Sequence, residues 1–501
     1  MRLSKVVCLI GLLLRPLGLA FILPCVVSLI YGERSEALGF IAVALLTSGI
    51  GHLFCLIGGR RFDDDLRRVE GCAVVAGAYL AVALIGAIPY LWAGLEFPDA
   101  LFEAMSGITA TGATILGDFS RYGRGLFFWR ALSQWLGGMG VIALFIAILP
   151  RLAIGGRQLF FAESPGPTDE KLTPQIRKTA AALWWLYVGL TFVEILALRL
   201  VGMSLYDSVC HALTNISAGG FSPRPLSIMG YNSPAIEWVI IFFMFLAGTS
   251  FMLQFRALRR PSVFLKDEEF KVYAWLVVTA AACLALLVWY DTGGSEVFAL
   301  RTGLFQALSI LTTTGYASAD FQTWNDQAKV VLLVLMFVGG CAGSAAGGQK
   351  IVRFLLMFRY AGAELRRMLH PQAMLPVKLG GRVIPEDVMR AIFVFILFNF
   401  MLLVICTLVL VAFGADFVTG ATASLSTLGN VGPGLGAVGP MSSYAGLHAV
   451  SKVTLTAAMW IGRLEVMTVL VFFQTEVWRN VSWRSGNGSR VVQQNWEKRQ
   501  W

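Results

Sequence analysis

Thr312-Thr313-Thr314-Gly315 is a short polar stretch in an otherwise apolar chain, and related stretches recur three more times. The other three are Thr109-Ala110-Thr111-Gly112, Ser217-Ala218-Gly219-Gly220 and Gly429-Asn430-Val431-Gly432. A hydroxyl side chain stands six residues before each final glycine, at Ser106, Thr214, Ser309 and Ser426. The final glycines are spaced by about 108, 95 and 117 residues, so the chain contains a degenerate fourfold internal repeat.

The bulk composition places these stretches in a membrane. Hydrophobic residues make up 57% of the 501 residues, charged residues make up 14%, and the mean hydropathy is +0.70. This composition lies well outside the range of soluble globular proteins. Apolar runs such as 74–92, 236–255 and 392–413 are long enough, or nearly so, to cross a hydrocarbon core of about 30 Å. We therefore predict an all-α integral membrane protein.

Each glycine-containing stretch is predicted to re-enter the membrane rather than to cross it. The helical segments before the first two, 99–109 and 206–216, hold about eleven residues, whereas a crossing helix needs about 20. Non-helical backbone at membrane depth is tolerated only where it is buried in protein or lines a water-filled path. Glycine allows the left-handed dihedrals that turn successive carbonyls toward one axis, and a ring of carbonyls can replace the water shell of a cation. The backbone expected to coordinate the cation comprises Thr111, Gly112, Gly219, Gly220, Thr314, Gly315, Val431 and Gly432, with the adjoining Ala110, Ala218, Thr313 and Asn430.

The distribution of Lys and Arg predicts the topology. About 29 of the 40 Lys and Arg residues lie in five polar segments or beside the N-terminus, and such residues concentrate on the cytoplasmic side of a membrane. The glycine-containing stretches have acidic neighbours instead and are expected to face outward. Both termini are then cytoplasmic, and contact with membrane lipid, not with nucleic acid, explains the net charge of +10. The five basic segments are 60–68, 151–178, 256–271, 350–390 and 479–499.

The predicted organisation is two N-terminal transmembrane helices followed by four pseudo-symmetric repeats around one pore. Each repeat consists of a helix, a pore loop and a second helix, which gives ten spanning segments in all. Asp99 and Asp207 are expected to cap the first turns of re-entrant helices, whose negative C-terminal ends favour a central cation. The expected boundaries are 1–70 for the two-helix segment, 71–152, 178–260, 270–360 and 385–480 for the repeats, and 481–501 for a cytoplasmic tail.

Taken in order, the four stretches resemble the filter sequences of the Trk/Ktr/HKT superfamily of potassium translocation proteins, and of its bacterial TrkH/TrkG type in particular. The most specific part is Gly429-Asn430-Val431-Gly432-Pro433-Gly434 in the last position, and the resemblance covers nearly the whole chain. It implies a multi-pass protein of the bacterial cytoplasmic (inner) membrane that translocates K⁺ and has no organic cofactor. Some plant relatives carry serine at the first filter glycine and favour Na⁺. Glycine at all four positions here therefore implies K⁺.

The segment Gly339–Gly348 is predicted not to form a stable helix, because each interior glycine destabilises a helix by about 1 kcal/mol. It lacks the Gly-Lys-Ser/Thr ending of a phosphate-binding loop. By resemblance it is the intramembrane loop that gates the pore, through Gly339, Gly340, Gly343, Gly347 and Gly348.

Arg463 stands within an apolar helical segment, where an ionisable side chain points to a function. By resemblance this arginine projects toward the permeation path and belongs to the gate. The alternative is a structural role, either in a salt bridge with Glu465 or at a helix end. Two residues apart on a helix do not face each other, which weighs against the salt bridge.

Two other classes of function, a coupled symporter and an enzyme, would require different residues from those of an ion-conducting pore. An H⁺- or Na⁺-coupled cation symporter is the alternative function, and it would need a buried carboxylate or histidine near the membrane midplane. No metalloprotease motif, nucleophile elbow or working pair of acids favours an enzyme. The resemblance implies a homodimer with a cytoplasmic TrkA-type nucleotide-binding regulatory subunit, docked on the segments 151–178 and 350–390. The candidates for a coupling residue are Glu194, Glu237, His211 and His448.

Overall fold

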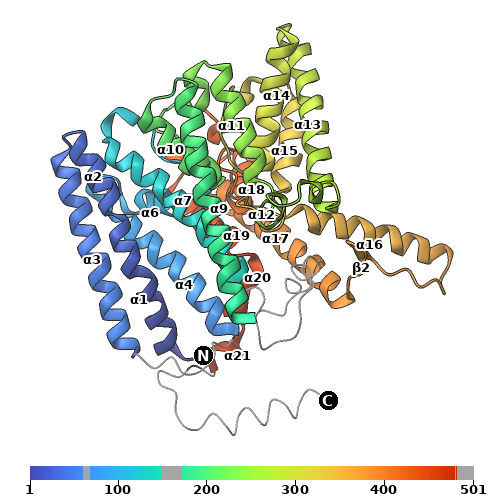
Figure 1. Ribbon diagram of the computed structural model, residues 1–501, viewed down its shortest axis with the longest axis horizontal. Helices are drawn as coiled ribbons and strands as arrows, with labels where there is room; N and C mark the ends of the chain where they lie inside the picture. Colours follow the sequence, from blue (N-terminus) through green and yellow to red (C-terminus); the bar gives the residue numbers. More distant parts are fainter. Residues whose placement is uncertain (60–67, 148–171, 480, 482–501) are drawn as a thin grey trace.

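The structure, a computed structural model, describes residues 1–59, 68–147, 172–479 and 481. The elements in these ranges are α-helices and short 3₁₀ helices, with one exception, and the helices form one bundle (Figure 1). The exception is an antiparallel hairpin of two short strands, β1 (Lys378–Leu379) and β2 (Arg382–Val383), which pairs Lys378 with Val383 and Leu379 with Arg382. The prediction of an all-helical membrane protein is confirmed.

The N-terminal segment forms a tight helical hairpin along one edge of the bundle. Helices α1 (Leu3–Ala20) and α2 (Ile22–Ile30) run against α3 (Arg34–Gly58). Small residues bring the backbones together: a Cβ built on Gly11 would lie 2.7 Å from the Gly51 carbonyl oxygen. Such close approach is how apolar helices associate in lipid, where packing and not water exclusion provides the attraction.

After this hairpin, the same order of elements occurs four times. In each, a long helix leads into a short helix, and the short helix leads through a glycine-containing turn into a second, often interrupted helix. The elements are α4 (Arg68–Gly86), α5 (Ile88–Trp92), α6 (Phe97–Ile108) and α7 (Arg124–Ala147); α9 (Leu172–Leu200), α10 (Leu205–Ile216), α11 (Pro234–Ala247) and α12 (Phe251–Ala257); α13 (Glu268–Thr292), α14 (Glu296–Leu311), α15 (Asp326–Phe337) and α16 (Ile351–Leu369); and α17 (Glu386–Ala412), α18 (Phe417–Gly429), α19 (Ala449–Arg463), α20 (Val466–Leu470) and α21 (Thr475–Arg479).

Several of the second helices are broken. Within the described ranges, six helices are long and apolar enough to cross a membrane, or seven if the bent pair α11 and α12 counts as one span. That pair bends by 101° at a break, and α15 ends at Phe337, before the glycine-rich segment. The ten spanning segments expected from the sequence are therefore not ten continuous helices, because glycines interrupt some of them.

The short helices α6, α10, α14 and α18 hold between 12 and 16 residues, too few to cross the hydrocarbon core. The prediction that Asp99 and Asp207 cap the first turns of two of these helices is wrong. Helix α10 is capped by Ser204, whose hydroxyl accepts a hydrogen bond from the backbone N–H of Asp207, and α6 begins after Glu96 without a side-chain cap. Asp99 and Asp207 lie inside the first turn, where their carboxylates are free to bind cationic side chains.

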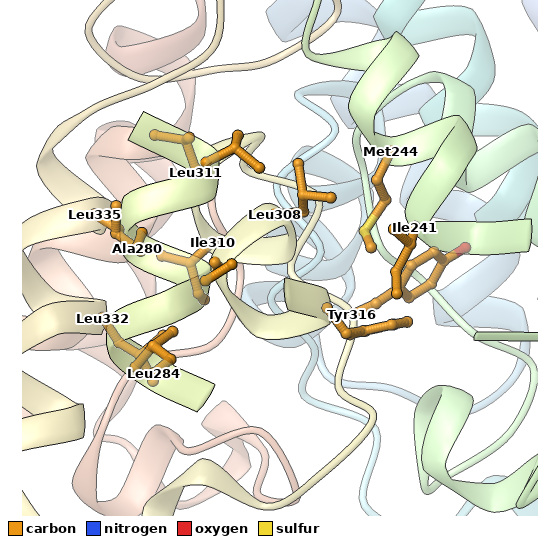
Figure 2. Packing of buried hydrophobic residues seen from close by; sticks show 14 of the residues in the cluster. Ile241, Met244, Ala280, Leu284, Leu308, Ile310, Leu311, Tyr316, Leu332 and Leu335 are labelled. Atoms are coloured by element: carbon orange, nitrogen blue, oxygen red, sulfur yellow. The ribbon is translucent and has the colours of Figure 1, made fainter. Parts of the chain in front are cut away.

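The third group of helices packs around an extensive apolar core (Figure 2). Side chains of α13, α14 and α15 interdigitate there, and α11 closes one side. The tightly packed surroundings leave the turn that follows α14 little freedom to move. The core residues labelled in Figure 2 are Ile241, Met244, Ala280, Leu284, Leu308, Ile310, Leu311, Tyr316, Leu332 and Leu335.

An ion pair closes the bundle by joining its first and last short-helix regions. Lys452 Nζ of α19 lies 2.7 Å from Asp99 Oδ1 of α6, and the two side chains are only 10% and 25% exposed. The two residues are 353 positions apart in the chain. This contact therefore depends on the fourth group of helices returning to the first.

Replacing Lys452 by Met is expected to lower the stability of the folded protein by about 1–3 kcal/mol, because it leaves the partly buried Asp99 carboxylate unpaired. Thermal melting of the purified protein in detergent measures the effect. Arg121→Met is the matched control, since Arg121 pairs with Asp118 at the surface, where the side chains are 76% and 53% exposed. Equal melting temperatures for the two variants would contradict a role for the Lys452 pair in closing the bundle.

Candidate ion-coordination site

All four predicted stretches share one backbone conformation. Each has a positive φ two residues before its final glycine and a second positive φ at that glycine. Left-handed residues interrupt the alternation of carbonyl directions in an extended chain, so successive carbonyls can face the same side. The φ angles are 50° at Ala110, 54° at Ala218, 57° at Thr313 and 53° at Asn430, and then 84° at Gly112, 75° at Gly220, 75° at Gly315 and 106° at Gly432.

Three of the first set, Ala110, Ala218 and Thr313, have side chains that disfavour this conformation. A left-handed residue other than glycine is strained by about 1–3 kcal/mol and persists only when its surroundings hold it. All three are fully buried. The surrounding protein therefore enforces the conformation.

The shared hydroxyl position has a structural role that all four stretches have in common, and it is carried by the backbone carbonyl group. In each stretch, the carbonyl oxygen of this residue accepts a hydrogen bond from backbone N–H groups at or just before the final glycine. This bond folds the stretch back onto the C-terminal end of its short helix. The four bonds run from Thr111 N to Ser106 O at 2.9 Å, from Gly219 N to Thr214 O at 2.8 Å, from Gly315 N to Ser309 O at 3.0 Å and from Val431 N to Ser426 O at 2.8 Å.

The final glycines Gly112, Gly220, Gly315 and Gly432 form a closed ring, called here the glycine ring. A Cβ built on each glycine would press against the backbone oxygen just before the next glycine in chain order, and the fourth returns to the first. Four chain segments thus meet around one centre, with backbone oxygens between them. The contacts are 2.3 Å from Gly112 to Gly219 O, 1.8 Å from Gly220 to Thr314 O, 2.1 Å from Gly315 to Val431 O and 2.7 Å from Gly432 to Thr111 O.

An open pocket lies against the glycine ring. All four ring glycines line it, together with Arg130, Arg224 and Tyr444. Arg130 is buried and its charge is balanced: its Nε donates to Glu103 Oε1 at 2.8 Å. No sequence pattern reveals this pair, since Glu103 and Arg130 are 27 residues apart on different helices.

Two further side chains hold the ring oxygens in place. Gln134 of α7 donates from Nε2 to Gly219 O at 2.7 Å and accepts from Phe221 N at 3.0 Å. Tyr444 donates to Gly432 O at 2.7 Å. A carbonyl oxygen has two lone pairs, so these carbonyls keep acceptor capacity. Gln134 and Tyr444 also escaped the sequence analysis, because neither belongs to a repeated pattern.

The segment between α15 and α16 is irregular, as its glycine content predicted, and it packs directly against two of the four stretches. Gly347 N donates to Thr313 Oγ1 at 2.6 Å, and a Cβ on Gly347 would lie 2.7 Å from Gly429 O. Further bonds tie the segment to the break between α11 and α12, from Cys341 N to Gly248 O at 2.9 Å and from Phe251 N to Gly343 O at 3.0 Å.

The other glycines that were predicted to belong to the gate lie at the ends or turns of this segment. Gly339 N donates to Gln349 O at 2.6 Å, so the two ends of the segment meet. Gly340 approaches Gly248 O, where a Cβ would lie 2.8 Å away. Gly343 and Gly348 have φ angles of 74° and 65°, which a side chain would disfavour.

Arg463 is the last residue of α19 and is 5% exposed. Its Nη1 donates to Ala345 O at 3.2 Å, within the glycine-rich segment. The expected alternative of a salt bridge with Glu465 is wrong, because Glu465 binds Arg353 at 2.5 Å; the alternative of a helix end is correct in position. In the described part of the chain, Nε and Nη2 of Arg463 make no hydrogen bond. A buried guanidinium with unpaired donors is unstable without water beside it.

The candidate coupling residues do not gather in one place. Glu237 binds Arg301 at 2.7 Å, and His448 caps the first turn of α19. His211 contacts Asp207 O and Ser222 Oγ through its two ring nitrogens. Glu194 is fully buried and accepts a hydrogen bond from Asn215. Within the ranges that the structure describes, no group of three or more His, Cys, Asp or Glu side chains is placed to hold a metal ion.

These features define a class of protein: a helical membrane protein in which four re-entrant segments meet at a ring of glycines. Comparisons with known proteins identify the family. The TrkH family model, described as cation transport protein, matches residues 60–485. The chain belongs to the TrkH family, which is a family of transport proteins and not of enzymes.

The alignments with known relatives cover almost the whole length of both chains. The Trk system potassium uptake protein TrkH of Salmonella typhimurium is 36% identical over 94% of this chain and 98% of the relative. The Trk system potassium uptake protein TrkG of Escherichia coli K12 is 34% identical over 94% and 97%. A crystal structure of the potassium transporter TrkH from Vibrio parahaemolyticus superposes with a TM-score of 0.87 at 31% identity, covering 95% of this chain and 100% of that one.

Gly220→Ala is expected to lower the stability of the protein by about 3 kcal/mol or more, since the new methyl group would meet Thr314 O in a backbone conformation that alanine disfavours. The melting temperature and the yield of monodisperse protein measure this effect. Gly362→Ala in α16 is the control, because its Cβ meets nothing within 4 Å and alanine favours a helix by about 1 kcal/mol. If Gly220→Ala is as stable as Gly362→Ala, a methyl group fits inside the glycine ring and the close contact is contradicted.

Proposed function

We propose that this protein carries K⁺ across the bacterial cytoplasmic membrane through the glycine ring, which acts as the selectivity filter. The observation that carries the proposal is the closed contact of four glycines with four backbone oxygens in chain order. A stack of carbonyl oxygens around one axis replaces the hydration shell of a cation. The names of the relatives, potassium uptake proteins, support K⁺ as the transported ion.

The short helices support the same role electrostatically. Helices α6, α10, α14 and α18 each end just before a ring stretch, so their partial negative charges lie next to the proposed path. Neutral oxygens and helix ends attract a cation without binding it so tightly that it cannot leave. The filter is built from the backbone of Thr111, Gly112, Gly219, Gly220, Thr314, Gly315, Val431 and Gly432, with Ala110, Ala218, Thr313 and Asn430 behind it.

The glycine-rich segment and Arg463 form the proposed gate. The hydrogen bond from Gly347 N to Thr313 Oγ1 supports a position against the filter, and the bond from Arg463 to Ala345 O supports coupling between the segment and α19. In this proposal the segment blocks the path when closed. The guanidinium of Arg463 then repels K⁺ below the filter.

The topology and the partners complete the proposal. The N-terminus and α21 lie at the same end of the bundle (Figure 1), which agrees with two cytoplasmic termini. Helix α16 and the β hairpin project from the bundle (Figure 1) and carry Arg359, Arg366 and Arg367. This basic projection is the proposed contact for a TrkA-type regulatory subunit and within a homodimer. The second proposed docking segment, 151–178, lies mostly outside the described residues. We also propose the four repeats, with the boundaries expected from the sequence, as the pseudo-symmetric units of the pore.

A symporter coupled to H⁺ or Na⁺ is the second candidate function. The observation that favours it is Glu194, a fully buried carboxyl group for which the described residues provide no ion pair. Uptake of radioactive Rb⁺ by proteoliposomes, with and without a pH gradient at fixed membrane potential, separates the two. Uptake that follows the electrical and Rb⁺ gradients alone supports a channel-like protein, and uptake that requires the proton gradient supports a symporter.

Gly112→Ser is expected to raise Na⁺ permeation relative to Rb⁺, because a side chain at φ 84° displaces carbonyls that must match the larger ion. Fluxes of ²²Na⁺ and ⁸⁶Rb⁺ into proteoliposomes measure the ratio. Gly117→Ser is the matched control, since its Cβ has only one neighbour, at 4.0 Å. An unchanged ratio in Gly112→Ser and in the equivalent variants of Gly220, Gly315 and Gly432 would remove the filter assignment.

Arg463→Ala is expected to fold and to conduct faster, with looser closure. Two unit charges about 4 Å apart repel by about 4 kcal/mol at an effective dielectric constant of about 20, and water in the path moderates this barrier. Flux and melting temperature are measured on the same purified variant. Arg353→Ala, which breaks the pair with Glu465, controls for the loss of an arginine near the segment. Lower stability of Arg463→Ala without a gain in flux would exclude it from the gate.

A further inference from the structure

The carboxyl group of Glu194 contacts the side-chain amide of Asn215, whose Nδ2 also donates to Ile240 O at 3.3 Å. Glu194 of α9 is fully buried, and its Oε1 accepts a hydrogen bond from Asn215 Nδ2 of α10 at 2.6 Å. Two buried oxygens of this pair make no hydrogen bond with any described residue: Oε2 of Glu194 and Oδ1 of Asn215. Both are acceptors if the carboxyl group is ionised, which would leave two orphaned acceptors in one buried contact.

The charged groups on the helices packed against α9 are engaged elsewhere. Arg130 of α7 binds Glu103, Asp207 of α10 binds Arg224, and Glu237 of α11 binds Arg301. Further titratable side chains on and near these helices are Tyr187 and Cys210, which are fully buried, His211, which contacts Asp207 O and Ser222 Oγ, and Tyr316, whose hydroxyl contacts Thr214 Oγ1 and His211 O. On α12 the charged residue is Arg256, in the last turn. An ionised carboxylate buried without a cation is destabilised by several kcal/mol.

We propose that Glu194 is held as the neutral acid and forms two hydrogen bonds with the Asn215 amide, and that this Glu194–Asn215 pair positions the second stretch of the filter. A neutral carboxyl group has one O–H donor. With the proton on Oε2, that oxygen donates to Asn215 Oδ1, while Oε1 keeps its bond from Nδ2. The two orphaned oxygens then satisfy each other, and no further group is required.

The link from this pair to the glycine ring runs through one peptide group. The carbonyl oxygen of Asn215 accepts hydrogen bonds from the N–H groups of Ser217 and of Ala218, the latter at 2.8 Å. Ala218 has the left-handed φ of 54° and precedes Gly219 and Gly220. Fixing the Asn215 side chain therefore fixes the carbonyl that holds the strained start of this segment.

The second stretch has Ser217, whose hydroxyl donates to Leu213 O and Thr214 O, but it lacks the hydroxyl or amide contact that the other stretches make from the two residues before their final glycine. In the first and third segments, threonine hydroxyls brace each other, at 2.7 Å between Thr109 and Thr111 and at 2.8 Å between Thr312 and Thr314. In the fourth, Asn430 Nδ2 binds Thr111 Oγ1 at 2.9 Å. The second segment has Ala218-Gly219, which carry no polar side chain. The residues that correspond to Asn215 in the other segments are Gly107, Ile310 and Thr427.

The protonation state is tested by infrared spectroscopy of the full-length protein at neutral pH. We expect the wild-type protein to show a carbonyl stretch of a protonated carboxyl group that is absent from Glu194→Gln. The matched control is Glu237→Gln, which removes a buried carboxyl group paired with Arg301 and should leave this band intact. A spectrum in which Glu194→Gln removes no such band overturns the proposal. This measurement does not depend on transport, so it can fail or succeed separately from the proposed function.

The positioning role, which rests on the proposed K⁺ filter, is tested by the Rb⁺/Na⁺ flux ratio. The amide of glutamine has a carbonyl acceptor and N–H donors, so it can replace the neutral acid in both bonds, and Glu194→Gln should keep the wild-type ratio. Glu194→Leu and Asn215→Leu should lose selectivity. A Glu194→Gln variant as unselective as Glu194→Leu overturns the proposal. So does an infrared band that disappears when K⁺ is added, which would make Glu194 a cycling proton carrier.

Discussion

The structure depends on the close approach of four glycines to the backbone oxygens of the neighbouring stretches. With Cβ positions between 1.8 and 2.7 Å from these oxygens, no side chain fits at any of the four places without displacing backbone. In the proposed filter, the close approach also decides which ion binds, because backbone oxygens are then the groups nearest the centre. The packed core behind α14 and the ion pair between α6 and α19 hold short helices that end at this ring.

The backbone conformation repeats in all four stretches, whereas the side chains that hold each stretch in place differ from one to the next. Threonine pairs, Gln134, Tyr444 and Asn430 each hold one part of the ring. A chain with four unequal copies can tune each copy separately, and it can attach a control element to one of them. The glycine-rich segment contacts the third and fourth stretches, at Thr313 and Gly429, so the proposed gate is attached to the ring at these two stretches.

Much of this organisation follows from the sequence, because the ring is made of local patterns. The membrane class, the all-helical fold, the four glycine stretches and the irregular glycine-rich segment were all predicted from composition and spacing. The predicted helix caps at Asp99 and Asp207 were wrong, since an acidic residue near a helix start fits either a cap or an ion pair, and only tertiary contacts with Lys452 and Arg224 distinguish them. The side chains around the ring were not predicted from the sequence, for the same reason. Gln134, Glu103 and Arg130 are single residues without a repeat, and their partners lie on other helices.

The central claim is that the glycine ring holds a permeant cation by its backbone oxygens. Anomalous X-ray diffraction from crystals of the full-length protein grown in Rb⁺ tests this claim most directly, because Rb⁺ replaces K⁺ and its position is read without reference to any transport assay. Ordered anomalous density centred among Gly112, Gly220, Gly315 and Gly432, weakened when Na⁺ replaces Rb⁺, is the predicted result. Well-diffracting crystals in which Rb⁺ occupies other sites while the centre of the ring holds none would contradict the account.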